Sequence, residues 1–415
     1  MRALLGVAML AACGDSLLPH DAEPSGVPDS SVGLVFVEVR GAVVQGGIPV
    51  VFQDADSSLV LSTQTDAAGH ANAYMAAGGF VTVVTPDQIL TYAGVVPGDT
   101  LAFEPFTTGI ADAVISMRVR VPAEAGAVGY RLYSPCGSRE IFGAQLQPLD
   151  VSLGACDAVT DLIAVSTTST GAERSIFRRD VVLGHQATIE FEGAYQPELL
   201  STISVRDVPS GITLMLASQA IIDGADEVFP ARSAAIEIAG GTGASSVTMP
   251  MPPQATISTH LEAPSAQTTG LLHVIEWQPT TTDVVLSYDR DRPRSYTERP
   301  SYRATDPAVV WREDAEGLVA DGVIVQVTWT DNQLGRHHWT VLAPRSSEPV
   351  VRLPILPNPV LRPLASTISV VRLDSFRLDG GYDHARSTFR LGKQLARGLW
   401  FSDAPAGRVV YQSLD

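Results

Sequence analysis

The sequence predicts an all-β protein that is built of several β-sandwich modules in tandem. Short runs rich in Val, Ile, Thr and aromatic residues recur about every eight to twelve residues along the chain. Clusters of Gly, Pro, Asp and Ser separate these runs, as turns between strands require. Few stretches have the apolar spacing of an amphipathic helix. Together these three observations favour packed sheets over helical layers.

Composition and charge limit the classes of protein. The chain has 415 residues and is 45% hydrophobic, which suits two to four globular domains. Its net charge of −17 argues against nucleic acid as a partner. The charge is uneven, since residues 13–263 hold 10 Arg against 28 acidic residues, whereas residues 264–415 hold 17 of each sign. All five tryptophans lie in that neutral final part, so we expect the two parts to differ in role.

The first residues have the pattern of an export signal. Met1-Arg2 is a short positive start, and Leu4 to Ala12 is an apolar run too short to span a bilayer. The motif Leu10-Ala11-Ala12-Cys13 resembles the bacterial lipobox, which implies cleavage before Cys13 and attachment of lipid to that cysteine. The competing interpretation is an incidental cysteine near a truncated start.

This resemblance predicts an address and an anchor. Residues 1–12 would be the signal peptide and residues 13–32, rich in Pro, Ser and acidic side chains, a flexible lipidated linker. Acyl chains contribute about 0.8 kcal/mol per buried CH₂, so several of them hold a protein durably at a membrane. We therefore expect a lipid-anchored protein of the cell envelope, most consistent with the outer membrane.

Residues 33–107 are expected to form the first sandwich. Its predicted strands are Leu34–Val39, Pro49–Gln53, Val60–Gln64, Ala71–Met75 and Phe80–Val84. Gly47-Ile48-Pro49-Val50, Thr65 to Ala71 and Gly79 to Val83 are similar to motifs of carboxypeptidase-regulatory-like and bacterial immunoglobulin-like domains. The resemblance implies an immunoglobulin-like or prealbumin-like sandwich that acts as a spacer or an adhesion module.

One turn of this stretch carries oxygen ligands at alternate positions. Asp54, Asp56 and Ser58 have the spacing that begins a calcium loop. However, Thr65 stands where such a loop needs a bidentate Glu, and no Gly occupies its sixth position. A solvated turn is therefore the favoured interpretation, and no metal or other cofactor is expected.

The middle of the chain continues in strands. Residues 113–195 are predicted to form a second sandwich, which a Cys136–Cys156 disulfide would staple in an oxidising compartment. Two buried free thiols are the alternative. Residues 196–262 form a further β region, either a separate unit or part of the preceding module.

Residues 264–415 form the Trp-rich final β module, which contains the candidate binding site. The side chains of one Arg- and Tyr-rich segment suit a sugar, a peptide end or an acidic patch, because Arg binds carboxylates and Tyr offers a flat amphipathic face. Internal ion pairing with the acidic front is the competing interpretation. The candidates are Tyr288, Arg290, Arg292, Arg294, Tyr296, Arg299, Tyr302 and Arg303. The tryptophans serve either as a sugar platform or as buried core.

No catalytic motif stands out. The chain has no Gly-x-Ser-x-Gly elbow and no His-Glu-x-x-His zinc motif. The neighbours His337 and His338 would face opposite sides of a strand. We therefore expect a non-enzymatic binding, adhesion or scaffold protein with a protein or glycan ligand. The alternatives are an envelope hydrolase of glycans that uses an unidentified carboxylate pair, and a purely structural spacer.

Overall fold

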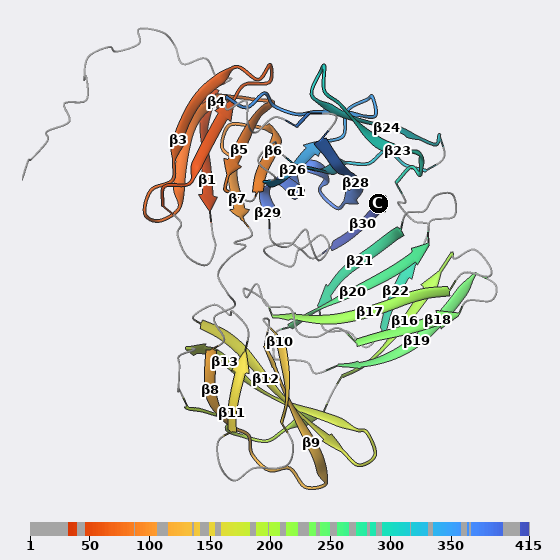
Figure 1. Cartoon of the computed structure of the whole chain (residues 1–415). Coiled ribbons are helices and arrows are strands. Elements are labelled where there is room, and N and C mark those ends of the chain that lie inside the picture. The colour runs from red at the N-terminus through yellow and green to blue at the C-terminus, as the bar shows by residue number, and fades with distance from the viewer. Residues whose placement is uncertain are drawn as a thin grey trace, which may run out of the picture.

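The fold is given by a computed structural model of the whole chain (Figure 1). It describes residues 32–414 except 40–45, 87, 106–114, 135–136, 142–148, 154–158, 183–187, 198, 208–212, 223–231, 238–240, 250–254, 265–270, 280–282, 288–292, 316, 331–334, 358–362, 365–366 and 393–406. The described chain forms six sheets and one short helix. This confirms the prediction of an all-β protein with several sandwich-like modules. Cys13 with its leader, Cys136 and Cys156 lie outside the described residues.

The front of the chain forms a sandwich whose first sheet has four strands. Along β1, Val35, Val37 and Val39 are buried while Phe36 points outward, which is the alternation expected of a strand with one face on a core. Three strands of this sheet come from the front of the chain and the fourth from near its end. In order they are β29 (Arg390–Gly392), β7 (Thr100–Glu104), β1 (Val32–Val39) and β4 (His70–Ala76).

The facing sheet is much wider and has 12 strands. Across the sheet, strands from the middle of the chain come first, strands from its final region follow, and strands from its N-terminal part come last. Only its last four strands belong to the front stretch. In order, the strands are β18 (Arg232–Glu237), β17 (Thr213–Ile222), β20 (Ala255–Pro264), β21 (Leu271–Pro279), β30 (Gly407–Leu414), β28 (Ile368–Leu378), β25 (Gly322–Thr330), β26 (Arg336–Pro344), β6 (Gln88–Val95), β5 (Gly79–Val84), β2 (Pro49–Gln53) and β3 (Leu59–Gln64).

A parallel pairing of β6 with β26 joins the front of the chain to its final region. The register runs from Gln88 opposite His338 to Tyr92 opposite Leu342. At its centre the buried indole of Trp339 donates a hydrogen bond to Thr91 Oγ1 at 2.9 Å, across 248 residues of sequence. Parallel strands need long crossover connections, and this one spans most of the chain.

One hydrophobic core is shared by the two ends of the chain. It combines Val35, Phe52 and Phe103 of the front stretch with Leu342 and Phe376 of the final region, and all five side chains are fully buried. The stretches 33–107 and 264–415, which were expected to be separate modules, therefore pack together around common apolar side chains. Their strand pairing explains this arrangement, because a continuous sheet turns both sets of strands toward the same facing sheet.

Helix α1 (Gly381–Thr388) fastens the end of the chain to the front sandwich (Figure 1). Its buried Arg386 lies 2.7 Å from Asp99 Oδ2, and Arg386 Nη1 donates to the carbonyl oxygen of Gly94 at 3.0 Å. The hydroxyl of Tyr382 lies 2.5 Å from the carbonyl oxygen of Ala93 and 3.1 Å from that of Leu342, so it contacts β6 and β26 together. The sequence analysis did not anticipate this helix.

A smaller sheet covers the other face of the wide sheet near its centre. Its strands are β23 (Tyr296–Arg303), β24 (Ala308–Glu313) and β27 (Val350–Arg352), in that order. Tyr296, Val309 and Trp311 of this sheet pack against Val325 and Trp339 of the wide sheet. The central strands of the wide sheet are thus buried on both faces, which accounts for the long apolar run of β25.

The middle of the chain contains a separate pair of sheets. The buried residues Met117, Leu132, Leu162 and Ile176 form their core. One sheet has the order β10 (Gly137–Ile141), β9 (Ala127–Ser134), β12 (Val159–Thr168), β13 (Glu173–Val182) and β15 (Gln196–Pro197). The other has the order β11 (Leu149–Leu153), β8 (Ile115–Arg120) and β14 (Thr188–Glu190).

Strands of residues 196–262 pair with strands of the final region. Strand β20 forms an antiparallel hairpin with β21, from Thr256 opposite Pro279 to Pro264 opposite Leu271. A further sheet has the order β19 (Thr242–Met249), β16 (Leu199–Arg206) and β22 (Asp283–Ser287). The expected division near residue 263 therefore falls within paired strands. Within the described chain, no helix has the length and apolar character needed to cross a membrane.

The contact of Arg386 with Asp99 gives a prediction for stability. Because both side chains are largely buried, Arg386→Met leaves the Asp99 carboxylate without its ionic partner, although the backbone N–H of Val96 still donates to it at 2.7 Å. We expect a loss of about 3–5 kcal/mol of unfolding free energy in urea titrations. The double variant Asp99→Asn/Arg386→Met should recover part of this loss. The matched control is Arg352→Ala, since Arg352 is exposed and lies 4.0 Å from its partner Asp306. Equal midpoints for Arg386→Met and the control would contradict the role given to α1.

Candidate functional site

The structure describes five of the eight candidate residues in the Arg- and Tyr-rich segment. Tyr288, Arg290 and Arg292 lie outside the described residues. Tyr296 is fully buried in the core beneath β23, and this burial raises the pKa of its hydroxyl well above the ordinary range. Its ring is therefore unavailable to a ligand at the surface.

The other described members of this segment differ in their surroundings. Arg303 lies 3.8 Å from Asp306, an exposed ion pair between residues three apart, and Tyr302 donates to the carbonyl oxygen of Pro363 at 3.3 Å. Arg294 is half-buried and Arg299 is exposed. Arg299 makes no hydrogen bond or ion pair with the described chain, so its charge is open to a ligand.

The three tryptophans whose side chains are described form core. Trp311, Trp329 and Trp339 are all at least 95% buried. Glu313 holds Trp311 in place, because its carboxylate accepts from the Trp311 indole at 2.7 Å and lies 2.9 Å from the buried guanidinium of Arg345. Arg345 also stacks over the Trp311 ring at 5.2 Å. These indoles do not form a sugar platform.

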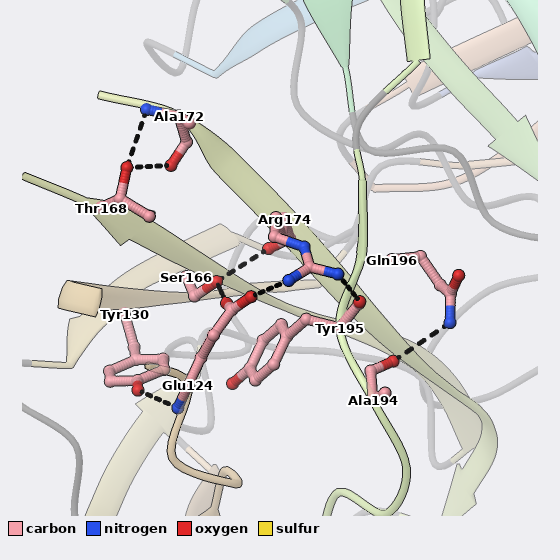
Figure 2. A network of polar contacts seen from close by, with 9 residues as sticks. All are labelled: Glu124, Tyr130, Ser166, Thr168, Ala172, Arg174, Ala194, Tyr195 and Gln196. Atoms are coloured by element: carbon pink, nitrogen blue, oxygen red, sulfur yellow. Dashed lines mark hydrogen bonds and ion pairs between the residues drawn. The ribbon is translucent and has the colours of Figure 1, made fainter. Parts of the chain in front are cut away.

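A second buried carboxylate lies at the centre of a polar network in the middle module (Figure 2). Glu124 stands after β8 with a side chain only 9% exposed, and it accepts from Arg174 Nη1 at 2.6 Å and from the hydroxyl of Ser166. Arg174 also donates to the carbonyl oxygen of Tyr195 at 2.7 Å. The network joins the end of β8 to strands β12 and β13 and to the segment that leads into β15.

The chemistry of this network is structural. Ser166 is fully buried, so its hydroxyl cannot reach a substrate in solution, although it contacts a carboxylate as a nucleophile contacts its base. Burial, with smaller effects from nearby Tyr130 and Glu124, raises the pKa of the Tyr195 hydroxyl, which therefore stays protonated. We interpret the cluster as a clasp that fixes the strands of this sheet.

The acidic turn before β3 is closed by its own hydrogen bonds. The backbone N–H of Ser58 donates to Asp56 Oδ1 at 2.8 Å, and Gln53 donates from its side chain to the carbonyl oxygen of Ser57 at 2.9 Å. Hydrogen bonds from Ser58 lower the pKa of Asp56. In the part of the chain that the structure describes, no three His, Cys, Asp or Glu side chains gather as a metal site requires.

The outer face of the front sheet carries large apolar side chains. Val32 and Phe36 of β1 are 46% and 44% exposed, and Tyr74 of the neighbouring β4 is 67% exposed. Tyr74 lies directly opposite Leu34, on the same face as Phe36. We call Val32, Leu34, Phe36 and Tyr74 the apolar front face. Its strands are held from behind by the buried Val35, Val37 and Ala73.

The sequence analysis did not single out the apolar front face. Alternation along β1 showed that every second residue would point away from the core, but Val32, Leu34 and Phe36 made both faces apolar. Such a strand is typical of full burial. The signal that was present is the apolar character of three of the four outward positions, all but Glu38, on a strand whose neighbour β4 ends its sheet.

Comparisons with known proteins assign the chain to no family. No protein-family model matches the chain, and no curated protein matches its sequence. Solved structures with similar segments include the Bacillus anthracis TIE protein, at 11% identity over 62% of this chain and a TM-score of 0.16. The match spans about half of that protein's length, 50%.

Two further structures are similar at the same low level. A Bacteroides ovatus protein titled as a candidate adhesin matches at 8% identity over 44% of this chain and 98% of its own, with a TM-score of 0.18. A Salmonella alpha-2-macroglobulin variant matches at 13% identity over 80% of this chain and 27% of its own, with a TM-score of 0.12. Similarity at this level carries no argument about the fold or the activity of this chain.

The Glu124 clasp gives a prediction about stability: removing this buried carboxylate should cost more than removing an exposed carboxylate of the same module. Glu124→Ala leaves the buried hydroxyl of Ser166 with only its long contact to the carbonyl oxygen of Arg174, at 3.4 Å, so we expect a loss of about 1–3 kcal/mol. Faster hydrogen exchange of the β12 and β13 amides reports this loss locally. The control is Glu190→Ala in the same module. Its ion pair with Arg120 has side chains 44% and 47% exposed, and exposed pairs contribute less than about 1 kcal/mol. Equal exchange in the two variants would disprove the clasp.

Proposed function

We propose that the chain is a lipid-anchored protein of the cell envelope that presents a binding surface for another protein. Two features support this proposal. The Leu10-Ala11-Ala12-Cys13 motif provides the anchor, and the following spacer leads directly into β1. The binding role rests on the apolar front face. Under this proposal the all-β body is a scaffold and carries no catalytic role.

The apolar front face is the observation that carries the binding role. Exposed apolar side chains that lie singly on a surface need no explanation, whereas neighbouring ones on adjacent strands are typical of interaction sites. Phe36 and Tyr74 are aromatic, and aromatic side chains are enriched where proteins bind one another. Because their strands are buried from behind, ordering these side chains on binding costs little backbone entropy.

A protein fits this face better than a glycan does. Sugar recognition combines a flat aromatic ring with polar groups that bind hydroxyls. Here Tyr74 lies opposite the aliphatic Leu34, and the polar Asn72 and Thr100 lie beside Phe36 only, at the margin of the face. The three described tryptophans, which would be the natural stacking platforms, are in the core. The exposed Arg299 offers a second, polar contact point, but it lies on the separate small sheet.

The anchor gives the first prediction of this function. Cys13→Ala removes the thiol that would carry the acyl chains, so the protein should move from the membrane fraction to the soluble fraction and lose incorporation of labelled palmitate. The double variant Cys136→Ala/Cys156→Ala is the control, because it removes the other two cysteines of the chain and keeps Cys13. Equal membrane recovery and equal labelling of Cys13→Ala and the unmodified protein would refute the anchor.

The binding surface gives the second prediction. A photoreactive phenylalanine analogue at Tyr74 should form a discrete cross-linked adduct with an envelope protein in intact cells. The same analogue at Val128, which is 62% exposed on β9, is the matched control. Phe36→Ser, introduced into the protein that carries the analogue at position 74, should reduce the yield of the adduct several-fold, because it removes the neighbouring apolar contact. Adducts of equal yield at both positions would eliminate the apolar front face as the site.

A further inference from the structure

Strand β3 is the last strand of the wide sheet and lies in the sandwich formed by the N-terminal part of the chain (Figure 1). Among the strands that the structure describes, it pairs with β2 alone, so every second residue turns its backbone N–H and C=O away from the sheet. All of its side chains are exposed or half-exposed, and Leu59, Val60 and Leu61 are the large apolar ones. From Leu61 to Gln64 the register with β2 is regular. This stretch is therefore an edge to which no other described strand pairs.

Natural proteins usually protect such edges. The common devices are Lys or Pro on the strand, inward charges, a bulge, or a covering loop. The sequence of β3, Leu-Val-Leu-Ser-Thr-Gln, contains no charge and no Pro. One bulge occurs near its start, where the register shifts at Gln53 and leaves Val60 without a partner on β2. The rest of the strand keeps the capacity to pair with a further strand.

Both ends of β3 are acidic. Asp54 and Asp56 precede the strand and Asp66 follows it, whereas residues 46–84 contain no Lys or Arg. Asp56 and Asp66 are exposed at the surface. Hydrogen bonds, from Ser58 to Asp56 and from the His70 backbone to Asp66, lower the pKa of each carboxyl, so both are ionised at neutral pH. An uncharged edge is thus flanked by negative charge on both sides.

This arrangement decides against a second copy of the chain as the occupant. Two antiparallel β3 strands would bring Asp54 and Asp56 of each copy against Asp66 of the other. Two parallel strands would place each aspartate beside its equivalent. Both directions are repulsive, and the net charge of −17 adds to the repulsion. An added strand with basic flanks would instead meet complementary charge at both ends.

We propose that the β3 edge binds an extended segment of a partner protein, apolar or uncharged in its centre and basic at its ends, as an added strand of the wide sheet. Main-chain hydrogen bonds to β3 would provide affinity, and the aspartates would select the basic flanks. This proposal deepens the proposed function, on which it rests. It specifies the chemistry of the partner segment that binds the β3 edge.

The test uses the full chain and a synthetic peptide of alternating valine and threonine with two lysines at each end. We expect saturable binding that weakens with salt, and slower hydrogen exchange of the amides of residues 59–64 in the bound state. A peptide of the same centre with glutamate ends is the charge control. A peptide with proline at alternate central positions is the hydrogen-bonding control, and neither control should bind comparably.

Three variants separate the contributions. Asp56→Asn and Asp66→Asn keep the side-chain oxygens that close their turns, and each should weaken binding about two- to fivefold, as expected for exposed charge pairs. Leu61→Lys places on the edge the charge that natural edges carry, and it should weaken binding at least about tenfold. Leu61 lies outside the core, so the variant should keep the urea midpoint of the unmodified chain.

Several results would overturn the inference. They are no binding of the lysine-flanked peptide by folded protein, equal binding of the glutamate-flanked peptide, or protection located away from residues 59–64. A dimer in solution that Leu61→Lys dissociates would show that a second copy is the occupant. If the Tyr74 cross-link persists while the peptide fails to bind, strand addition is wrong and the proposed function stands. If both fail, the proposed function falls with it.

Discussion

The parallel pairing of β6 with β26 is the interaction on which the rest of the fold depends. Without it the wide sheet would split into two sheets, each with a new free edge. The buried contact of Trp339 with Thr91 would be lost, and Leu342 and Phe376 would have no front sandwich to pack against. Backbone groups at an unpaired edge must find water or another strand. The pairing therefore creates the shared core and removes two edges at once.

This pairing makes the folding of the front stretch depend on residues at the far end of the chain. The strands of residues 33–104 can pair among themselves, but their core is completed by Leu342, Phe376 and the side chains of α1. Contacts between such distant residues require the closing of a very long loop, whose entropy cost must be met before they stabilise the fold. Arg386 and Tyr382 then tie the end of the chain to β6 through the carbonyl oxygens of Gly94 and Ala93.

Local patterns in the sequence were enough to predict strands. The tight turn of residues 66–69 formed as its Asp and Gly predict, with the Gly69 N–H donating to the Asp66 carbonyl oxygen at 3.0 Å and Gly69 at φ 86°. Burial of Trp329 and Trp339, which lie within the apolar runs of β25 and β26, was also an outcome that such runs favour. What local patterns do not contain is the choice of partner for each strand, and hence the join between β6 and β26.

The missed elements have specific physical causes. Helix α1 has only eight residues and begins after Gly380 in the left-handed region, at φ 91°, with no side-chain cap, so the usual start signals are missing. The segment of the candidate binding residues was chosen for its Arg and Tyr content, yet the ring of Tyr296 is in the core. Composition shows which side chains a segment has, and packing decides which of them a ligand can reach.

The three aspartates around β3 acquire a role because β3 lies at an edge of the wide sheet. An apolar run such as Leu59-Val60-Leu61 is typical of a buried strand, and on an open edge it would pair with any exposed strand it met. Placing Asp54 and Asp56 before the run and Asp66 after it leaves the central hydrogen-bonding groups available but opposes approach by strands with acidic flanks, including those of identical chains. Because repulsion between exposed charges acts before contact and weakens with salt, this protection costs the folded state little. Selectivity at such an edge comes from the flanks, whereas affinity comes from the backbone, which is the same for every sequence.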